Sequence, residues 1–357
     1  MPTFTRLTPL ALTLVLLGAV CPAPAEEAPK SLTVKERRAV NDLLSTFTRA
    51  RTDPDKQSKV VDEILAIGGP APAKLLALIG QQLGPLQARY RSAFYAAAKT
   101  VLRKRFVDRD PAEVDALRQT VRNLGSSDNL SKDEIVAKGD PAMAKLGEML
   151  WIDPETVLKA EPALLTQRTA LLDLGKHWQR AADYVAKHGP KRPGAPDEAP
   201  RFEDLVKADE MLATSLTLAT SDRDRKALIA NVDLEPRIEF EEANGIRDLN
   251  RIRLLLGLKP LQIDVALCEA ARDHSKDMVE KKFVAHDSPV PGKQTPWDRA
   301  KRFGTSAHAE NIAAGTKTGP DANRMWFHSP GHHKNMLGGH GRIGIGRHGN
   351  TWTQMFG

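Results

Sequence analysis

The chain has 357 residues, more than one hydrophobic core usually serves, so its length predicts two folded units. It carries 52 Lys and Arg against 45 Asp and Glu, a net charge of +7, with no concentrated basic stripe interleaved with aromatic residues. A surplus of this size can spread over two domains, so nucleic acid is not expected as a ligand. The glycine-rich loops that bind nucleotide phosphates are absent, and no nucleotide cofactor is expected.

The first 25 residues have the pattern of a secretory signal peptide. An apolar run at residues 10–17 follows Arg6, and residues 23–25 are small or proline, as a cleavage site requires. The run is too short to span a bilayer, so we expect a secreted or periplasmic protein with no transmembrane segment after signal removal. A lipid anchor on Cys21 is the less favoured alternative, because Val20 fits a lipoprotein cleavage box poorly.

Residues 26–188 are predicted to be an all-α helical region. They are rich in Ala, Leu, Lys, Arg and Glu, with apolar residues three and four apart. Residues 64–75 and 135–146 are identical at eight of twelve positions, and both contain a glycine shortly before a proline. This match predicts either two related helical hairpins or the same corner used twice in an unrelated bundle.

Residues 189–200 contain four prolines and no large apolar side chain, which predicts an extended linker. Connecting helices are expected at residues 201–237. The last predicted domain is residues 238–357. The connecting helices are expected to pack on this domain.

Local signals in this last domain predict helices and an antiparallel sheet, and therefore an α+β fold. A helical apolar stripe ends at Gly257, and Asp264 can cap the next helix. His274 lies on the apolar face of that helix, which favours a core histidine over a ligand. Residues 342–347 and 351–356 read as two strands of a hairpin.

Three short phrases in this domain occur in an order typical of one secreted family. They are Phe283-Val284-Ala285-His286, Ala309-Glu310-Asn311-Ile312-Ala313 and the segment from Trp326 to Leu337. Together with Gly257-Leu258-Lys259-Pro260-Leu261 and the final Trp352-Thr353-Gln354-Met355-Phe356-Gly357, they resemble the CAP family, also called SCP, of cysteine-rich secretory, antigen-5 and pathogenesis-related proteins, in its disulfide-free bacterial form. The resemblance implies a three-layer α-β-α sandwich with a central antiparallel sheet.

The resemblance also implies a cleft with two histidines and two acidic residues, which in some members bind a divalent cation. By motif, His286 and His332 match the histidines and Glu310 matches one acidic residue. Where animal members carry the other glutamate, this chain has Ser329. Two imidazoles and one carboxylate form a recognised open set for a divalent cation such as zinc, so these three residues are the predicted metal ligands.

Each of these residues also has a structural explanation. Ser329 followed by Pro330 fits the N-cap and first position of a helix. Glu310 can hold backbone amides in the following turn, and His286 can bridge its loop to the sheet. The remaining histidines of the domain are expected in loops or at the surface, and two tryptophans are expected to pack: His308, His328, His333, His340 and His348, with Trp297 and Trp326.

The sequence favours an extracellular binding module over an enzyme. Common hydrolase and nucleotide-binding motifs are absent, and Cys268, the one thiol left after signal removal, lies in an apolar helix and is expected to be inert. The ligand is unknown, and a lipid, a cell-surface component or a protein would each fit. The alternative is a hydrolase that uses metal-bound water or Ser329, with no catalytic residues identified.

Overall fold

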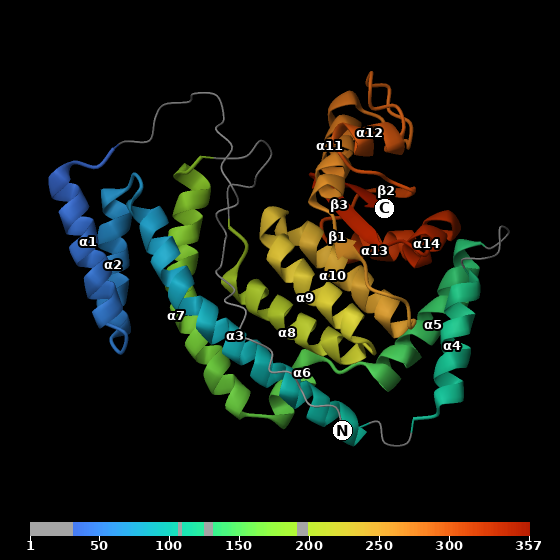
Figure 1. Ribbon diagram of the computed structural model, residues 1–357, viewed down its shortest axis with the longest axis horizontal. Helices are drawn as coiled ribbons and strands as arrows, with labels where there is room; N and C mark the ends of the chain where they lie inside the picture. Colours follow the sequence, from blue (N-terminus) through green and yellow to red (C-terminus); the bar gives the residue numbers. More distant parts are fainter. Residues whose placement is uncertain (1–30, 106–108, 125–130, 191–198) are drawn as a thin grey trace. The chain divides into compact units, whose positions relative to one another are not determined.

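The computed structural model describes residues 31–105, 109–124, 131–190 and 199–357 (Figure 1). The predicted signal peptide with Cys21, and most of the predicted linker, lie outside these ranges. No helix in the described ranges is long and apolar enough to cross a bilayer. Within them the chain forms two compact units, one from the described residues up to Phe94 and Leu158–Glu210, the other from those of Tyr95–Val157 and Met211–Gly357. The domain boundaries expected at residues 188 and 238 stay predictions.

The first unit is helical. Its described elements are α1 (Val34–Arg49), α2 (Pro54–Ile67), most of α3 (Ala71–Arg105), part of α6 (Pro154–Ala160), α7 (Ala163–His188) and the start of α8 (Phe202–Leu218). A buried polar cluster joins three of these helices, because the Tyr90 hydroxyl donates to Oε1 of Glu210 over 2.6 Å and Arg168 donates to the same oxygen over 2.8 Å. Burial and this carboxylate raise the pKa of Tyr90 well above its usual range.

The two similar segments noticed in the sequence have different conformations. In the first, Gly68 and Gly69 have φ angles of +69° and +54° and form a corner between α2 and α3. In the second, residues 139–141 lie inside the continuous helix α5 (Lys132–Leu150). Asp140 replaces Gly69, and a residue with a Cβ disfavours the left-handed region that makes the first corner. The expectation of a shared helix corner is therefore wrong for the second segment.

The second unit contains the remaining elements and one sheet. They are α4 (Pro111–Leu124), α5, α9 (Asp222–Leu234), η1 (Glu235–Arg237), α10 (Phe240–Leu255), β1 (Gln262–Ile263), α11 (Val265–Lys281), α12 (Pro296–Arg302), β2 (Ala309–Ala314), α13 (Gly319–Phe327), α14 (Pro330–Leu337), β3 (Arg342–His348) and β4 (Thr351–Phe356). The strand order is β1-β3-β4-β2. The two long pairings are antiparallel, as predicted, whereas the two-residue strand β1 pairs with β3 in parallel.

Helices cover both faces of this sheet. α11 packs on one face against β3 and β4, while α10, α13 and α14 pack on the other (Figure 1). This confirms the predicted α+β class with its three-layer α-β-α sandwich. The helix expected to stop at Gly257 does so with φ +68°, and Asp264 accepts hydrogen bonds from the amides of Ala266 and Leu267 as the expected N-cap of α11.

Two glycines of β3 let α11 lie very close to the sheet. A Cβ atom on Gly346 would lie 2.0 Å from the backbone nitrogen of Arg272, and one on Gly344 would lie 2.3 Å from the carbonyl carbon of Leu267. No side chain fits at either distance, so the glycines set the separation of the helix and the strand. The close packing brings the inward face of α11, which carries His274, against the sheet.

The hairpin of α4 and α5 shares one hydrophobic core with the sheet domain. Val121, Leu124, Ile135 and Leu146 belong to the same buried cluster as Trp326 and the other core residues of α10, α13, α14 and the strands. Polar contacts accompany this packing, since Arg118 donates to the carbonyl of Leu255 over 2.9 Å. Part of the helical sequence before residue 158 therefore completes the core of the second unit.

Candidate functional site

Four elements of the second unit bring the candidate site together. Glu310 lies on β2, His286 in the loop between α11 and α12, and His332 in the first turn of α14. Arg299, from the middle of α12, is a fourth member that the sequence analysis did not identify. Thr295 and Asp298 cap α12 reciprocally, the Thr295 hydroxyl accepting from the Asp298 amide over 3.2 Å, and so fix the start of the helix that carries Arg299.

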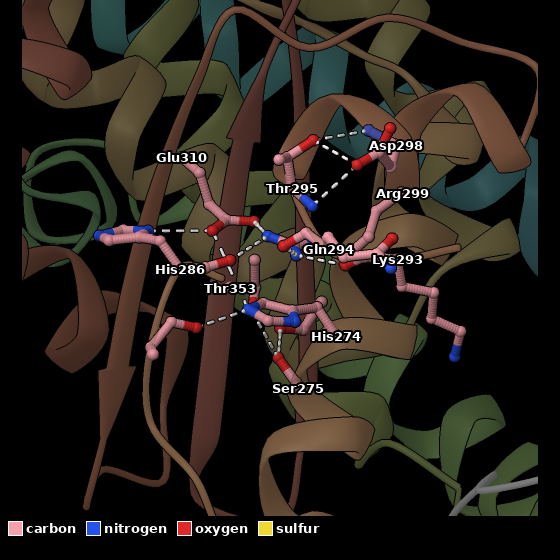
Figure 2. Close-up of polar contacts among 12 residues, drawn as sticks. His274, Ser275, His286, Lys293, Gln294, Thr295, Asp298, Arg299, Glu310 and Thr353 are labelled. Atoms are coloured by element: carbon pink, nitrogen blue, oxygen red, sulfur yellow. Dashed lines mark hydrogen bonds and ion pairs between the residues drawn. The ribbon is translucent and has the colours of Figure 1, made fainter. Parts of the chain in front are cut away.

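The carboxylate of Glu310 lies between Arg299 and His286 (Figure 2). Nη2 of Arg299 donates to Oε2 over 2.6 Å, and Nδ1 of His286 lies 3.0 Å from Oε1. The side chains of Glu310 and Arg299 are 2% and 0% exposed. Their opposite charges and close contact compensate the desolvation that each would otherwise suffer alone.

Arg299 also organises the loop that carries His286. Its guanidinium donates to the carbonyls of His286 and Lys293 over 2.9 Å each, and to that of Gln294 over 3.3 Å. One buried cation thus holds both the Glu310 carboxylate and the two ends of the His286 loop. The position of His286 against Glu310 depends on this arginine.

His286 is the solvent-facing member of the cluster. Its side chain is 48% exposed, and its Nδ1 faces Glu310 while the opposite ring edge points away (Figure 2). The hydrogen bond to Glu310 is the main cause that raises the pKa of His286, and burial opposes it. The pair therefore orients an imidazole whose Nε2 is available to a ligand and favours its cationic form.

His332 completes the polar surface without touching the carboxylate. Its ring centroid is 6.2 Å from that of His286, with the planes at 61°. Burial, followed by the nearby charge of His286, lowers the pKa of His332. The backbone is held by Asn311, whose amide donates to the His332 carbonyl over 3.2 Å. The two rings thus have opposite protonation tendencies within one polar cluster, which stands where the family resemblance implies a cleft.

His274 lies beneath this cleft as the core histidine expected from its helix face. Its side chain is fully buried, its Nε2 lies 3.1 Å from the Ala285 carbonyl, and the same atom is 4.0 Å from Oε1 of Glu310. Burial lowers the pKa of His274. A neutral ring that donates from Nε2 to Ala285 fits these contacts, so His274 supports the loop leading to His286.

Glu310, one of the predicted metal ligands, is fully engaged by protein groups. Both oxygens of Glu310 already have partners, and one partner is the buried cation Arg299. Among the described residues, no group of three His, Cys, Asp or Glu is arranged to hold a metal ion. A divalent cation at Glu310 would sit beside a guanidinium and would have to replace its hydrogen bond. As placed, both oxygens of Glu310 already have hydrogen-bond partners, and the assignment of His286, Glu310 and His332 as metal ligands stays a prediction.

The expected position of Ser329 is confirmed, and two other expectations are wrong. Ser329 precedes α14 as predicted, but its side chain makes no capping hydrogen bond. His333, expected at the surface, is fully buried, with Nδ1 2.7 Å from the Phe327 carbonyl and Nε2 3.2 Å from that of Val121 on α4. Trp297, expected to pack, is 58% exposed. Helical position does not reveal which distant element covers a side chain, and here α4 covers His333.

Cys268 and Trp326 lie where the sequence placed them. Both are buried, Cys268 completely and Trp326 with 1% of its surface exposed. Burial raises the pKa of the Cys268 thiol far above its usual range, which keeps it protonated and unreactive. Neither residue offers a nucleophile to the cleft.

The family comparison agrees with the fold and the motif order. The family model of the cysteine-rich secretory protein family, CAP, matches residues 246–356. Residues 246–356 are a CAP domain. This identification confirms the predicted family for the last third of the chain and leaves the first helical unit outside it.

Similar proteins match the CAP domain alone. The uncharacterized protein YkwD of Bacillus subtilis (strain 168) is 44% identical over 112 residues, 30% of this chain and 43% of YkwD. The uncharacterized membrane protein YlbC of the same organism is 32% identical over 122 residues, 34% of this chain and 35% of YlbC. The match thus spans less than half the length of either relative.

One solved structure also resembles this region. It is an extracellular protein containing a SCP domain from Bacillus anthracis str. Ames, with 30% sequence identity and a TM-score of 0.32. The likeness covers 35% of this chain and 42% of that protein.

Proposed function

We propose that this chain is an exported binding protein whose CAP domain recognises an extracellular ligand at the cleft of His286, Glu310 and His332. The observation that carries the proposal is the hydrogen-bonded series from Arg299 through Glu310 to His286, which fixes an exposed imidazole on a buried, charge-balanced base. Because the imidazole is already held in place, little of its conformational entropy is lost when a hydrogen-bonding ligand binds.

Export rests on the sequence. The pattern of the first 25 residues is that of a secretory signal, and the only other cysteine, Cys268, is buried and free. We therefore place the ligand outside the cytoplasm, in the periplasm or beyond the cell. Lipids, cell-surface components and proteins are the candidate ligand classes.

Recognition by hydrogen bonds is favoured over recognition through a resident metal. The Glu310 carboxylate is already neutralised by Arg299, so a cation would gain less there than at an uncompensated carboxylate. His286 Nε2 and the ring of His332 provide one donor-prone and one acceptor-prone group, since the pKa of His286 is raised and that of His332 is lowered. A ligand with a carboxylate or carbonyl beside a hydroxyl or amide would satisfy both rings.

The hydrolase alternative has weaker support. The His286–Glu310 pair resembles an oriented base, but a hydrolase also needs a nucleophile and donors for the developing negative charge. Cys268 is buried and protonated. The Ser329 hydroxyl has no hydrogen bond to a base among the contacts of the described residues. Binding therefore remains the function that the geometry supports best.

The proposal can be tested by thermal shift with the full mature chain against purified cell-envelope glycans, peptides and lipids. A ligand of the cleft should raise the melting temperature of the wild type and not that of a His286→Ala, His332→Ala variant. The matched control is His308→Ala, an exposed histidine of the same domain. Mass spectrometry of the recovered ligand should return it unchanged. Turnover that depends on His286 would instead support the hydrolase alternative.

A further inference from the structure

A concave surface lies along the free edge of the sheet. This edge groove has a volume of about 460 Å³ and includes one residue of the cleft, His332. Its other lining residues come from β2, from α13 and its C-terminal end, and from the first turn of α5. The residues that matter for the argument are Lys132, Ile312, Arg324, Met325, Trp326 and His332.

The backbone N–H and C=O groups of Ile312 point away from the neighbouring strand β4. Among the described strands, β2 lies at the edge and pairs only with β4. Gly315 donates to the Asn350 carbonyl over 2.9 Å, so residue 315 is a hydrogen-bonded position of the β2–β4 pairing. Hydrogen-bonded positions alternate, so residues 310, 312 and 314 direct their N–H and C=O groups outwards. The amide of Asn335, which donates to the Glu310 carbonyl over 3.1 Å, confirms this alternation.

In the part of the chain that the structure describes, the outward backbone groups of Ile312 have no such partner. Among the contacts of the described residues, none engages the N–H or the C=O of Ile312 beyond the strand pairing. Ile312 also lines the edge groove. A donor and an acceptor on one edge-strand residue, next to a groove, are the features that let another extended chain add to a sheet.

The charged residues at the edge groove determine which net charge of an added peptide is favoured. Lys132 and Arg324 are exposed, and the ion pairs of the described residues include neither. The one carboxylate of the lining, Asp321, accepts a hydrogen bond from the Thr318 hydroxyl over 2.6 Å as part of the α13 cap. Two cations beside an apolar floor that includes Met325, itself 45% exposed, favour an anionic partner with apolar side chains.

We infer that the edge groove binds an extended acidic peptide, which pairs with the free edge of β2 at Ile312 and places carboxylates near Lys132 and Arg324. An acyl chain would satisfy the cations and the apolar floor but would leave both backbone groups of Ile312 unpaired, so the peptide is the better fit. This inference rests on the proposed binding function and gives it a ligand class, at a surface next to the histidine cleft.

The test uses the full mature chain and a fluorescein-labelled peptide of seven residues in which Glu and Val alternate, with both ends blocked. Binding is followed by fluorescence anisotropy. A Lys132→Glu, Arg324→Glu variant should bind about tenfold more weakly or worse, because both favourable charge contacts become repulsive. A Lys301→Glu, Arg302→Glu variant makes the same change in net charge on exposed residues of α12 and should bind like the wild type.

Backbone pairing is tested with two further peptides, N-methylated at either the odd or the even residues. One of them should lose binding and the other should keep it, because only alternate amides of an added strand face the sheet. In protein labelled with ¹⁵N-isoleucine, the Ile312 amide signal should shift on titration. Equal binding by both methylated peptides, or Arg324-dependent binding of decanoate with no binding of the peptide, would overturn the inference.

The peptide experiment can fail or succeed independently of the test of the histidine cleft. Loss of peptide binding in the Lys132, Arg324 variant with no change in a His286→Ala variant places the peptide in the edge groove alone. Failure of the peptide to bind, together with a histidine-dependent ligand in the thermal shift experiment, would remove the edge groove inference and leave the cleft proposal intact.

Discussion

Nη2 of Arg299 lies 2.6 Å from Oε2 of Glu310, and neither side chain has more than 2% of its surface exposed. Glu310, the buried carboxylate of the cleft, therefore forms an ion pair with Arg299. The same guanidinium reaches the His286 carbonyl, so the two halves of the cleft share one anchor. The consequences for stability and for the histidine pKa values can be measured separately.

Replacing Arg299 by Met should destabilise the protein by about 3–5 kcal/mol, because it leaves the buried Glu310 carboxylate without its cation. Urea unfolding followed by tryptophan fluorescence measures the change. The control is Arg302→Met on the same helix, which removes an exposed charge and should alter the free energy of unfolding by no more than about 0.5 kcal/mol. Equal effects of the two substitutions would contradict the role given to Arg299.

The two cleft histidines should titrate on opposite sides of the ordinary histidine pKa, which is about 6.5. His286 should titrate above it because of its hydrogen bond to Glu310, and His332 below it because of burial. NMR of the ring Cε1–H signals gives both values. In a Glu310→Gln variant the pKa of His286 should fall, and an unchanged value would show that the pair is not formed in solution.

The raised pKa of His286 also predicts how its contribution to stability depends on pH. Because the folded state holds this proton more tightly than the unfolded state, the contribution is complete below the unfolded pKa and is lost as pH rises through the folded pKa. A His286→Gln substitution should therefore cost more stability at pH 5.5 than at pH 8.5. A cost that grows with pH would contradict this sign.

Gly346→Ala should destabilise the CAP domain by about 1–3 kcal/mol or more, because the added Cβ would collide with the backbone of Arg272. Chemical denaturation measures the loss. In the helix interior of α5, Gly147 has no atom within 4 Å of such a Cβ, so Gly147→Ala should be neutral or stabilise by up to about 1 kcal/mol. A tolerated Gly346→Ala would mean that α11 does not pack this closely on β3.

Residues 238–357 expressed alone should not unfold cooperatively, because part of their core belongs to α4 and α5. Val121, Ile135 and Leu146 are completely buried in the shared cluster, and each fully buried side chain of this size contributes about 1.5–3 kcal/mol. Calorimetric unfolding beside the full chain tests this. A sharp, reversible transition of the short fragment would show that the domain is independent of the hairpin.

Local features of the CAP domain could be predicted from the sequence because their causes are local. Gly257 ends α10, Asp264 caps α11, and residues 342–356 form the hairpin of β3 and β4, each set by a residue type or a period within a few positions. The motif order also brought His286 and Glu310 together correctly. These are the parts of the fold that short sequence windows determine.

The remaining features depend on contacts between distant segments. α12 carries Arg299, Lys301 and Arg302, and only its position between the His286 loop and β2 turns the first of them inward. The burial of His333 depends on α4, more than 200 residues earlier, which the pattern of α14 cannot reveal. Side-chain periodicity identifies a face of a helix but not the element that covers it.

The most direct test of the account is a zinc titration by calorimetry on the full mature chain, beside the His286→Ala, His332→Ala variant and the His308→Ala control. Because Arg299 and His286 already occupy the oxygens of Glu310, we predict no histidine-dependent heat at micromolar zinc. Micromolar or tighter binding that is lost in the double variant and kept in the control would contradict this prediction and support a metal site at the two histidines.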